Sequence, residues 1–184
     1  MAVSAESAKP DPGGEAAGRR DIVDRVIERW RAERPDLDPS GKEVTGRIVR
    51  LNGLFHRAFC GDFVLEGIDE GGFAVLAALR RVGDPFELTP TALNRELLIS
   101  SGGVTHLVDR LERRGLVARR PGVGDRRSVR VALTPAGRVV ADRAMAAHAS
   151  TELRLVAGLT RRERDQLAGL LRKLLLSVDV DVME

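Results

Sequence analysis

The stretch LVARRPGVGDRRSVRVALT, residues 116–134, decides the fold. It begins with a short apolar run at Leu116 and ends with a run that alternates apolar and polar residues from Val129 to Leu133. Two such runs on either side of a glycine-containing loop are typical of a β-hairpin. The loop carries three charged residues at its tip: Asp125, Arg126 and Arg127. Arginines at an exposed tip stabilise no core, so their function must involve something outside the hairpin.

The residues before this hairpin predict two helices joined by a tight turn. Thr89-Pro90 is a start signal, a threonine N-cap followed by proline at the first helical position, and it opens a helix over about 90–97. The turn has the sequence LISSGG, and VTHLVDRLERR then forms a second helix that Gly115 closes. This order of short helix, tight turn, second helix and β-hairpin predicts a winged helix-turn-helix.

Further helices are predicted on both sides of this motif, over about 20–33, 41–63, 70–82, 135–157 and from 161 onward. Capping-box spacing marks two of their starts, at Ser40–Glu43 and Thr160–Glu163. Leucine-rich faces on the flanking helices would stay exposed in a monomer, which favours a homodimer. We expect a mainly α fold with a small β-hairpin wing, in four parts: a disordered tail (1–19), N-terminal dimerisation helices (20–66), a winged helix-turn-helix domain (67–137) and C-terminal dimerisation helices (138–184).

Positive charge is concentrated in one part of the chain. The net formal charge is +3, yet residues 110–130 hold eight arginines against Glu112 and Asp125, a local surplus of six positive charges. Such a concentration is typical of a site for a polyanion such as DNA, although a solvated basic surface is the alternative.

In a winged helix-turn-helix the second helix enters the DNA major groove and presents its N-terminal residues to the bases. The candidates for these contacts are Ser100, Ser101, Gly102, Thr105 and His106. His106 could donate to a guanine or a phosphate, or lie at the surface without a DNA contact. One turn further, Arg110 either reaches a phosphate or pairs on the helix surface with Asp109 or Glu112.

The hairpin then acts as the wing, and an arginine at its tip can enter the minor groove, where negative potential is focused in A·T-rich DNA. Arg126 is the preferred candidate for the groove, and Arg127 the alternative. Asp125 would repel phosphate, so we expect it to orient one arginine through a charge-assisted hydrogen bond. The competing interpretation is a short β-meander with a solvated tip.

Residues 88–137, and above all DRRS followed by LTPAG, resemble the DNA-binding core of the MarR transcription regulators. The resemblance implies an obligate homodimer built by the N- and C-terminal helices. It also implies an effector-gated repressor or activator that binds a pseudopalindromic operator in double-stranded DNA, with repression preferred.

RWRAERPDLD (29–38) and GGFAVLAALRRVG (71–83) further resemble the PecS-like branch, which has an extra N-terminal helix and often responds to urate. In that branch a Trp, an Asp and an Arg help to form the ligand pocket. Trp30 matches the first, but Ala74 and Leu107 stand at the other two positions. An anionic purine would find no charge partner there, so we expect a small aromatic or apolar ligand, or none. Trp30 is alternatively an anchor that docks its helix on the core, which is the preferred interpretation.

The sequence lacks the signatures of other classes. It has no P-loop, GxSxG, HExxH or dinucleotide motif, so no enzyme activity and no cofactor are expected. Its three histidines, His56, His106 and His148, have no metal-site spacing. Cys60 is expected to be an inert buried thiol, with oxidant sensing, as in some MarR relatives, as the alternative.

The location and the competing function follow from composition. No apolar run is long enough for a membrane span, no signal segment begins the chain, and one cysteine suits a reducing compartment, which predicts a cytoplasmic protein. The alternative function is a winged-helix protein-interaction module without sequence-specific DNA binding.

Overall fold

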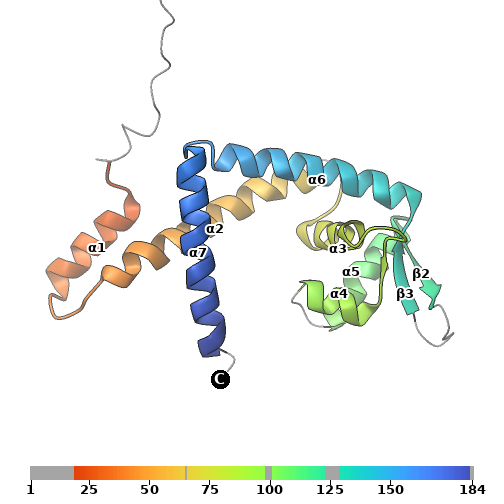
Figure 1. The fold of residues 1–184 in the computed structure, drawn as a ribbon, viewed down its shortest axis with the longest axis horizontal. Coiled ribbons are helices and arrows are strands. Elements are labelled where there is room, and N and C mark those ends of the chain that lie inside the picture. Colours follow the sequence, from red (N-terminus) through yellow and green to blue (C-terminus); the bar gives the residue numbers. More distant parts are fainter. Residues whose placement is uncertain (1–18, 65, 98–100, 123–128, 183–184) are drawn as a thin grey trace, which may run out of the picture. The chain divides into compact units, whose positions relative to one another are not determined.

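The structure of the chain is a computed structural model that describes residues 19–64, 66–97, 101–122 and 129–182 (Figure 1). Within these ranges the elements are α1 (Ile22–Glu33), α2 (Ser40–Val64), α3 (Glu70–Arg81), β1 (Glu87–Leu88), α4 (Pro90–Leu97), α5 (Ser101–Arg113), β2 (Val117–Pro121), β3 (Val129–Leu133), α6 (Pro135–Leu155) and α7 (Arg161–Val182). The chain divides into two compact units, one of residues 53–152 and one of residues 1–52 with 153–184. No described helix is both long enough and apolar enough to cross a membrane.

Residues 53–152 form a unit around an apolar core to which α3, α4, α5, α6 and both long strands contribute. The side chains of Leu76, Leu79 and Leu93 are fully buried, and Val104 and Val108 face them from α5. Each large apolar side chain removed from water in this way contributes ~1.5–3 kcal/mol. The core therefore fixes which face of α5 points inward and leaves the opposite face to solvent.

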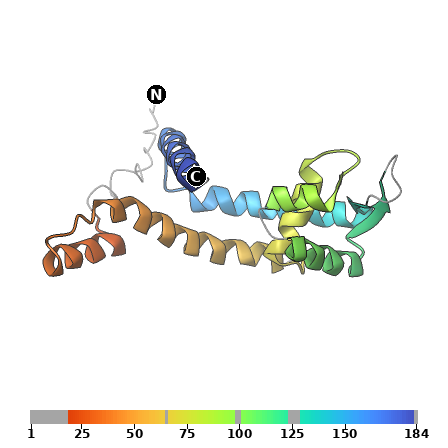
Figure 2. The same ribbon diagram turned by 90° about the horizontal axis from the view of Figure 1, so that it is seen from below.

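The sheet of this unit has three antiparallel strands in the order β1-β3-β2. The predicted hairpin is confirmed for its strands, with Val117 opposite Leu133 and Pro121 opposite Val129. The hairpin lies at one edge of the unit and projects beyond its helices, as both views show (Figures 1 and 2). Its loop, residues 123–128, lies outside the described residues.

Strand β1 is an addition to the prediction. It pairs with β3 through Glu87 and Leu88 alone. Just before it, Phe86 has a positive φ of 58° and its carbonyl accepts the N–H of Leu133 at 3.0 Å. Two guanidinium groups lie over the ring of Phe86. The Cζ atoms of Arg80 and Arg138 are 5.2 and 4.6 Å from the ring centroid. Cation–π contacts from α3 and α6 thus hold this corner at the base of the wing.

The predicted threonine N-caps are confirmed. Hydroxyl oxygens of Thr89, Thr134 and Thr160 accept the backbone N–H of Ala92, Gly137 and Glu163 at 3.1, 2.9 and 3.3 Å, respectively. Glu163 completes a capping box, because its carboxylate accepts the N–H of Thr160 at 2.7 Å. Gly115 has a φ of +70°, as expected of a residue that ends a helix in the left-handed region.

The capping box predicted at Ser40 is wrong. Helix α2 already includes Ser40, whose N–H and hydroxyl both donate to the carboxylate of Asp38 at 2.9 Å. The side-chain acceptor at the start of α2 is therefore the carboxylate of Asp38, which lies two residues before the first helical residue, and not the hydroxyl of Ser40. Glu43 instead accepts a hydrogen bond from Arg31 of α1 at 3.2 Å.

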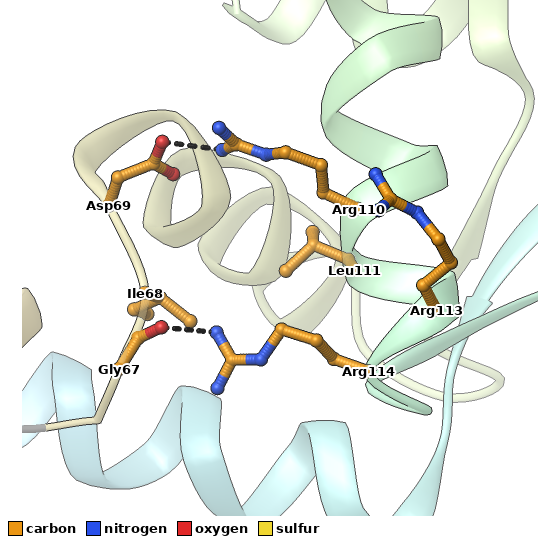
Figure 3. Close-up of a pocket in the computed structure, with 7 residues that line it drawn as sticks. All are labelled: Gly67, Ile68, Asp69, Arg110, Leu111, Arg113 and Arg114. Carbon is orange, nitrogen blue, oxygen red and sulfur yellow. Dashed lines mark hydrogen bonds and ion pairs between the residues drawn. The ribbon is translucent and has the colours of Figure 1, made fainter.

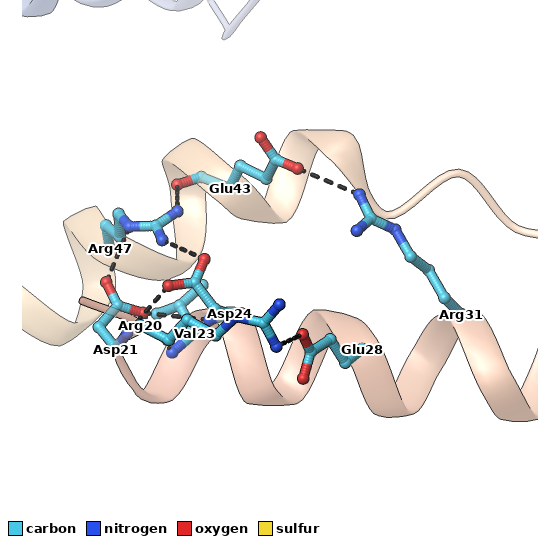
Figure 4. Close-up of polar contacts among 8 residues, drawn as sticks. All are labelled: Arg20, Asp21, Val23, Asp24, Glu28, Arg31, Glu43 and Arg47. Carbon is cyan, nitrogen blue, oxygen red and sulfur yellow. Dashed lines mark hydrogen bonds and ion pairs between the residues drawn. The ribbon is translucent and has the colours of Figure 1, made fainter. Parts of the chain in front are cut away.

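In the other unit, α1 is attached to the first part of α2 by ion pairs and a small apolar contact (Figure 4). Arg47 binds the carboxylates of Asp21 and Asp24 at 2.9 and 2.6 Å. Val23 is buried, and a Cβ at Gly46 would lie 3.0 Å from it, so the two helices approach closely there. A hydrogen bond from the backbone of Asp21, followed by one from Arg47, lowers the pKa of Asp24.

Candidate DNA interface

The N-terminal half of α5 exposes a polar strip on the side opposite to its buried residues. Gly102, Thr105 and His106 are exposed, whereas Val104 and Val108 are buried. A Cβ built at Gly102 meets no described atom within 4 Å, so a neighbouring molecule could approach its backbone closely. These three predicted contact residues therefore lie on one accessible surface.

Five other predicted contacts are less completely described. Ser101 begins α5, and its side chain lies outside the described part. Ser100, Asp125, Arg126 and Arg127 lie in ranges that the structure does not describe. Their roles stay predictions, although the helix and the strands that flank them are in place.

The sequence predicted Arg110 as a phosphate contact or as a partner of Asp109 or Glu112, and neither intrahelical pair forms. Its guanidinium instead binds the carboxylate of Asp69 at 2.5 Å, and Asp69 lies in the loop between α2 and α3 (Figure 3). Asp69 also caps α3 by accepting the N–H of Gly72 at 2.9 Å. Burial raises the pKa of Asp69, but the hydrogen bonds from Arg110 and Gly72 outweigh it, so the pKa lies below its ordinary value.

Asp109 and Glu112 are instead the partners of Arg119 on β2. The guanidinium of Arg119 lies 2.5 Å from Asp109 and also binds Glu112, and its backbone N–H donates to Glu112 at 2.8 Å. The hydrogen bond to Asp109 raises the pKa of Arg119, against the effect of burial. These contacts join the wing to α5, and the sequence analysis missed them. The available signal was the pair of acidic residues three apart on one face of α5.

Arg120 is a second residue that the sequence analysis missed. It is exposed on β2, directly opposite Arg130 of β3. Arg130 pairs with Glu87 of β1 at 3.3 Å, whereas the side chain of Arg120 has no ion-pair or hydrogen-bond partner among the described residues. An uncompensated guanidinium on the wing is suited to a phosphate contact.

The expectations for Trp30 and for the ligand pocket have different outcomes. The anchor interpretation of Trp30 is wrong for this chain, because the side chain is 46% exposed while Val23 and Ile27 dock α1. Its role in ligand binding stays a prediction. Leu107 packs over Gly71: a Cβ added at Gly71 would lie 2.6 Å from a methyl group of Leu107. An apolar contact therefore occupies the position at which the resemblance to the PecS-like branch implies a charged residue.

Cys60 is exposed, which corrects the expectation of a buried thiol. It follows Phe59, which packs against the core, and one residue along a helix turns the side chain about 100° away. Its sulfur lies 3.8 Å from Nε2 of His56, and Nδ1 of the same ring lies 3.1 Å from Glu70. In the described ranges no three metal-ligating side chains converge.

Comparison with known proteins identifies the family. The model of the MarR family matches residues 71–128. The transcriptional regulator PecS of Dickeya dadantii is 34% identical over 149 residues, which cover 81% of this chain and 90% of PecS. The chain therefore belongs to the MarR family, and its likeness to PecS agrees with the predicted resemblance to the PecS-like branch.

Solved structures agree in fold. A mutant MarR from E. coli in complex with operator DNA matches with a TM-score of 0.63 and 28% identity, over 73% of this chain and 96% of that one. BpsR of Bordetella bronchiseptica, whose DNA binding is regulated by 6-hydroxynicotinic acid, matches with a TM-score of 0.62 and 27% identity, over 72% of this chain and 94% of that one.

Proposed function

We propose that this chain is a homodimeric transcriptional regulator, in most settings a repressor, that binds a pseudopalindromic operator in double-stranded DNA. The proposal rests on two exposed surfaces that lie on connected elements. Thr105 and His106 are exposed on α5, and Arg120 is exposed on the wing. Arg119 joins the wing to α5 through its ion pair with Asp109. One element is then suited to base edges and the other to phosphates. The DNA-binding part corresponds to residues 67–137.

Dimerisation is assigned to residues 20–66 and 138–184. Helix α7 has seven large apolar side chains that the described part of this chain leaves exposed: Leu167, Leu170, Leu171, Leu174, Leu175, Leu176 and Val178. An apolar face of this kind supports burial against a second copy. Two copies of α5 would then meet successive major grooves about 34 Å apart.

DNA binding is tested with the DNA upstream of the protein's own gene and a random duplex of equal length. We expect the upstream DNA to bind at least ~10³-fold more tightly at fixed salt. Equal affinities would favour the alternative function, a protein-interaction module. Sedimentation of a Leu171→Asp, Leu175→Asp variant checks the dimer: the parent should sediment as a dimer and the variant as a monomer.

Release by a small aromatic or apolar effector is part of the proposal, with Trp30 as a candidate contact. The function needs no catalytic step, no cofactor and no metal, and we place it in the cytoplasm with the DNA it regulates. A thermal-shift screen of aromatic acids and purines checks the effector, and a flat response would indicate a regulator without one.

A further inference from the structure

Two arginines lie directly opposite each other on the two long strands of the wing. Arg120 of β2 is paired in register with Arg130 of β3. Side chains at directly opposite positions of antiparallel strands project from the same face of the sheet, with their Cβ atoms ~5 Å apart. Like charges at such positions repel each other and oppose the pairing of the strands. The hairpin therefore carries a pair of charges that its own folding does not favour.

This arginine pair lies on the face of the sheet that points away from α5. Successive residues of β2 and β3 alternate between the two faces. Val117 and Val131 belong to the apolar core, and Arg119, on the same face as these two, reaches α5. Arg120 and Arg130 each follow or precede a residue of that face by one position, so they lie on the opposite face. The pair is therefore presented on the outer face of the wing.

A glutamate on the third strand holds one of these arginines by a single nitrogen. Glu87 of β1 is opposite Ala132 of β3, which places it on the same face as Arg130. Its carboxylate is largely buried and lies 3.3 Å from Nη1 of Arg130. Among the described residues, the buried Nε of Arg130 has no hydrogen-bond partner, and no contact of Nη2 is found either. Glu87 thus holds the guanidinium and leaves its Nε–Nη2 edge unoccupied.

The unoccupied edge is one that binds oxyanions through two parallel hydrogen bonds. Arg34 shows this geometry elsewhere in the chain, because its Nε and Nη2 donate to the two carboxylate oxygens of Asp36 at 2.7 and 2.6 Å. A buried donor without a partner, such as Nε of Arg130, destabilises the chain until an acceptor satisfies it. The side chain of Arg130 is 35% exposed, so a rotation of the guanidinium brings this edge to solvent.

Neutralisation of Glu87 explains the presence of Arg130 but not that of Arg120. One positive charge is enough to balance one carboxylate, yet Arg120 adds a second, and its side chain has no partner among the described residues. Oxyanions beside the two guanidinium groups would offset their repulsion and would give Nε of Arg130 an acceptor. On a wing that contacts DNA, these oxyanions are backbone phosphates.

We propose that Arg130 binds a DNA phosphate next to the one contacted by Arg120, and that Glu87 positions Arg130 for this contact. Glu87 keeps its bond to Nη1 while Nε and Nη2 donate to the phosphate, so the guanidinium bridges a carboxylate of the protein and the DNA. The contact surface then includes β1, a strand that precedes the helix-turn-helix. This inference rests on the proposed function, because it requires DNA at the wing.

The test uses a double variant, Glu87→Gln with Arg130→Gln, and measures binding to the upstream DNA and to a random duplex over a range of salt concentrations. The variant loses one negative and one positive charge, so the net charge of the chain is unchanged and no unpaired carboxylate remains. We expect the affinity for both duplexes to fall ~10-fold, the effect of losing one charge-assisted contact. The slope of log K against log salt should decrease in magnitude by ~1. If Arg130 only neutralises Glu87, affinity and slope will equal those of the parent, and the inference is overturned.

Arg161→Gln with Asp165→Asn is the matched control, because it removes an exposed ion pair of α7 with the same change in charge. It should keep the affinity and the slope of the parent, and thermal unfolding verifies that both double variants are folded. Arg130→Lys tests the positioning role of Glu87. The ammonium still neutralises a phosphate, so the slope should stay the same, but it lacks the paired donors of arginine, so the affinity should fall. Parent-like affinity of Arg130→Lys overturns that role.

The outcomes separate this contact from the proposed function. Equal binding of the upstream DNA and the random duplex by the parent overturns sequence-specific regulation, and the phosphate contact is then measured on either duplex. A parent that binds neither duplex overturns both. Specific binding with an unchanged slope in Glu87→Gln, Arg130→Gln overturns the phosphate contact alone.

Discussion

Arg119 on β2 and Asp109 on α5 form an ion pair of 2.5 Å between residues ten positions apart in the chain. The same guanidinium binds Glu112, one turn further along α5. The side chain of Arg119 therefore attaches the base of the wing to the helix that would read the major groove.

Replacing Arg119 should affect DNA binding more than stability. In Arg119→Gln the free energy of unfolding should fall by no more than ~1 kcal/mol, because the paired side chains are at least one-third exposed and screened by solvent. Operator affinity should fall by ~10-fold or more, since Asp109 and Glu112 would then carry unpaired negative charge beside DNA. Urea denaturation and fluorescence anisotropy measure the two effects. A loss of stability with unchanged affinity would contradict the role of this pair in orienting the wing.

Arg120 should act on DNA without regard to sequence. Arg120→Ala should weaken binding to the operator and to a random duplex by similar factors, and reduce the slope of log K against log salt by ~1. Arg143→Ala serves as the control, with an unchanged slope expected. If the slope of Arg120→Ala equals that of the parent, Arg120 contacts no phosphate.

His106 should have the opposite signature. His106→Ala should relax discrimination at one base pair by ~1–3 kcal/mol and leave the salt slope unchanged, because a contact to a base edge releases no counterion. Binding to a panel of operators with single base changes measures this. An unchanged ranking of the panel would place His106 outside base recognition.

Gly137 should tolerate no side chain. A Cβ at this position would lie 1.8 Å from the carbonyl oxygen of Leu116, which also accepts the N–H of Thr134 at 3.1 Å. Gly137→Ala should lower the free energy of unfolding by at least ~2 kcal/mol, because backbone at the base of the wing must move. Gly61→Ala is the control: its Cβ meets nothing within 4 Å in the last turn of α2, so a gain of up to ~1 kcal/mol is expected. Similar stabilities of the two variants in urea would contradict this close approach.

The ionisation of Asp69 should make the free energy of unfolding depend on pH in the acidic range. Its pKa in the folded chain lies below the ordinary value of 3.8, so its ionised form stabilises the fold above that pH and the contribution disappears as the pH falls through the folded pKa. Asp69→Asn keeps an N-cap for α3 but loses the charge that binds Arg110. The parent should therefore be more stable than Asp69→Asn at neutral pH, and the difference should shrink below pH 3.8. Urea denaturation across this range measures it, and a constant difference would contradict the assignment.

Local patterns in the sequence predicted most of the elements that carry the proposed site. The threonine-proline signal at Thr89 and the alternation after Val129 each depend on residues close in sequence, and both are confirmed. Strand β1 was missed because its two residues are too few to show a period of two. The cap of α2 was misassigned because Ser40 and Asp38 both have side chains able to cap.

Partners far apart in the sequence could not be predicted. Asp69 and Arg110 are 41 residues apart, and only the packing of α3 against α5 brings them together. The sequence does not show that α3 packs against α5, so Asp109 and Glu112, which are close to Arg110 in sequence, were predicted as its partners. For the same reason no partner was predicted for Arg119. The exposure of Cys60 was likewise set by which face of α2 meets α3 and α6, as the rings of Phe59 and Phe63 around His148 show.

The ion pairs of Arg47 with Asp21 and Asp24 make added salt act at two places in this protein. Ions that displace the chain from DNA also screen the contacts by which α1 is attached to α2. A salt titration of the parent therefore combines the number of phosphates released with the partial detachment of a helix. In an Arg47→Gln variant these contacts are already absent, so its slope reports the phosphates with less interference from α1.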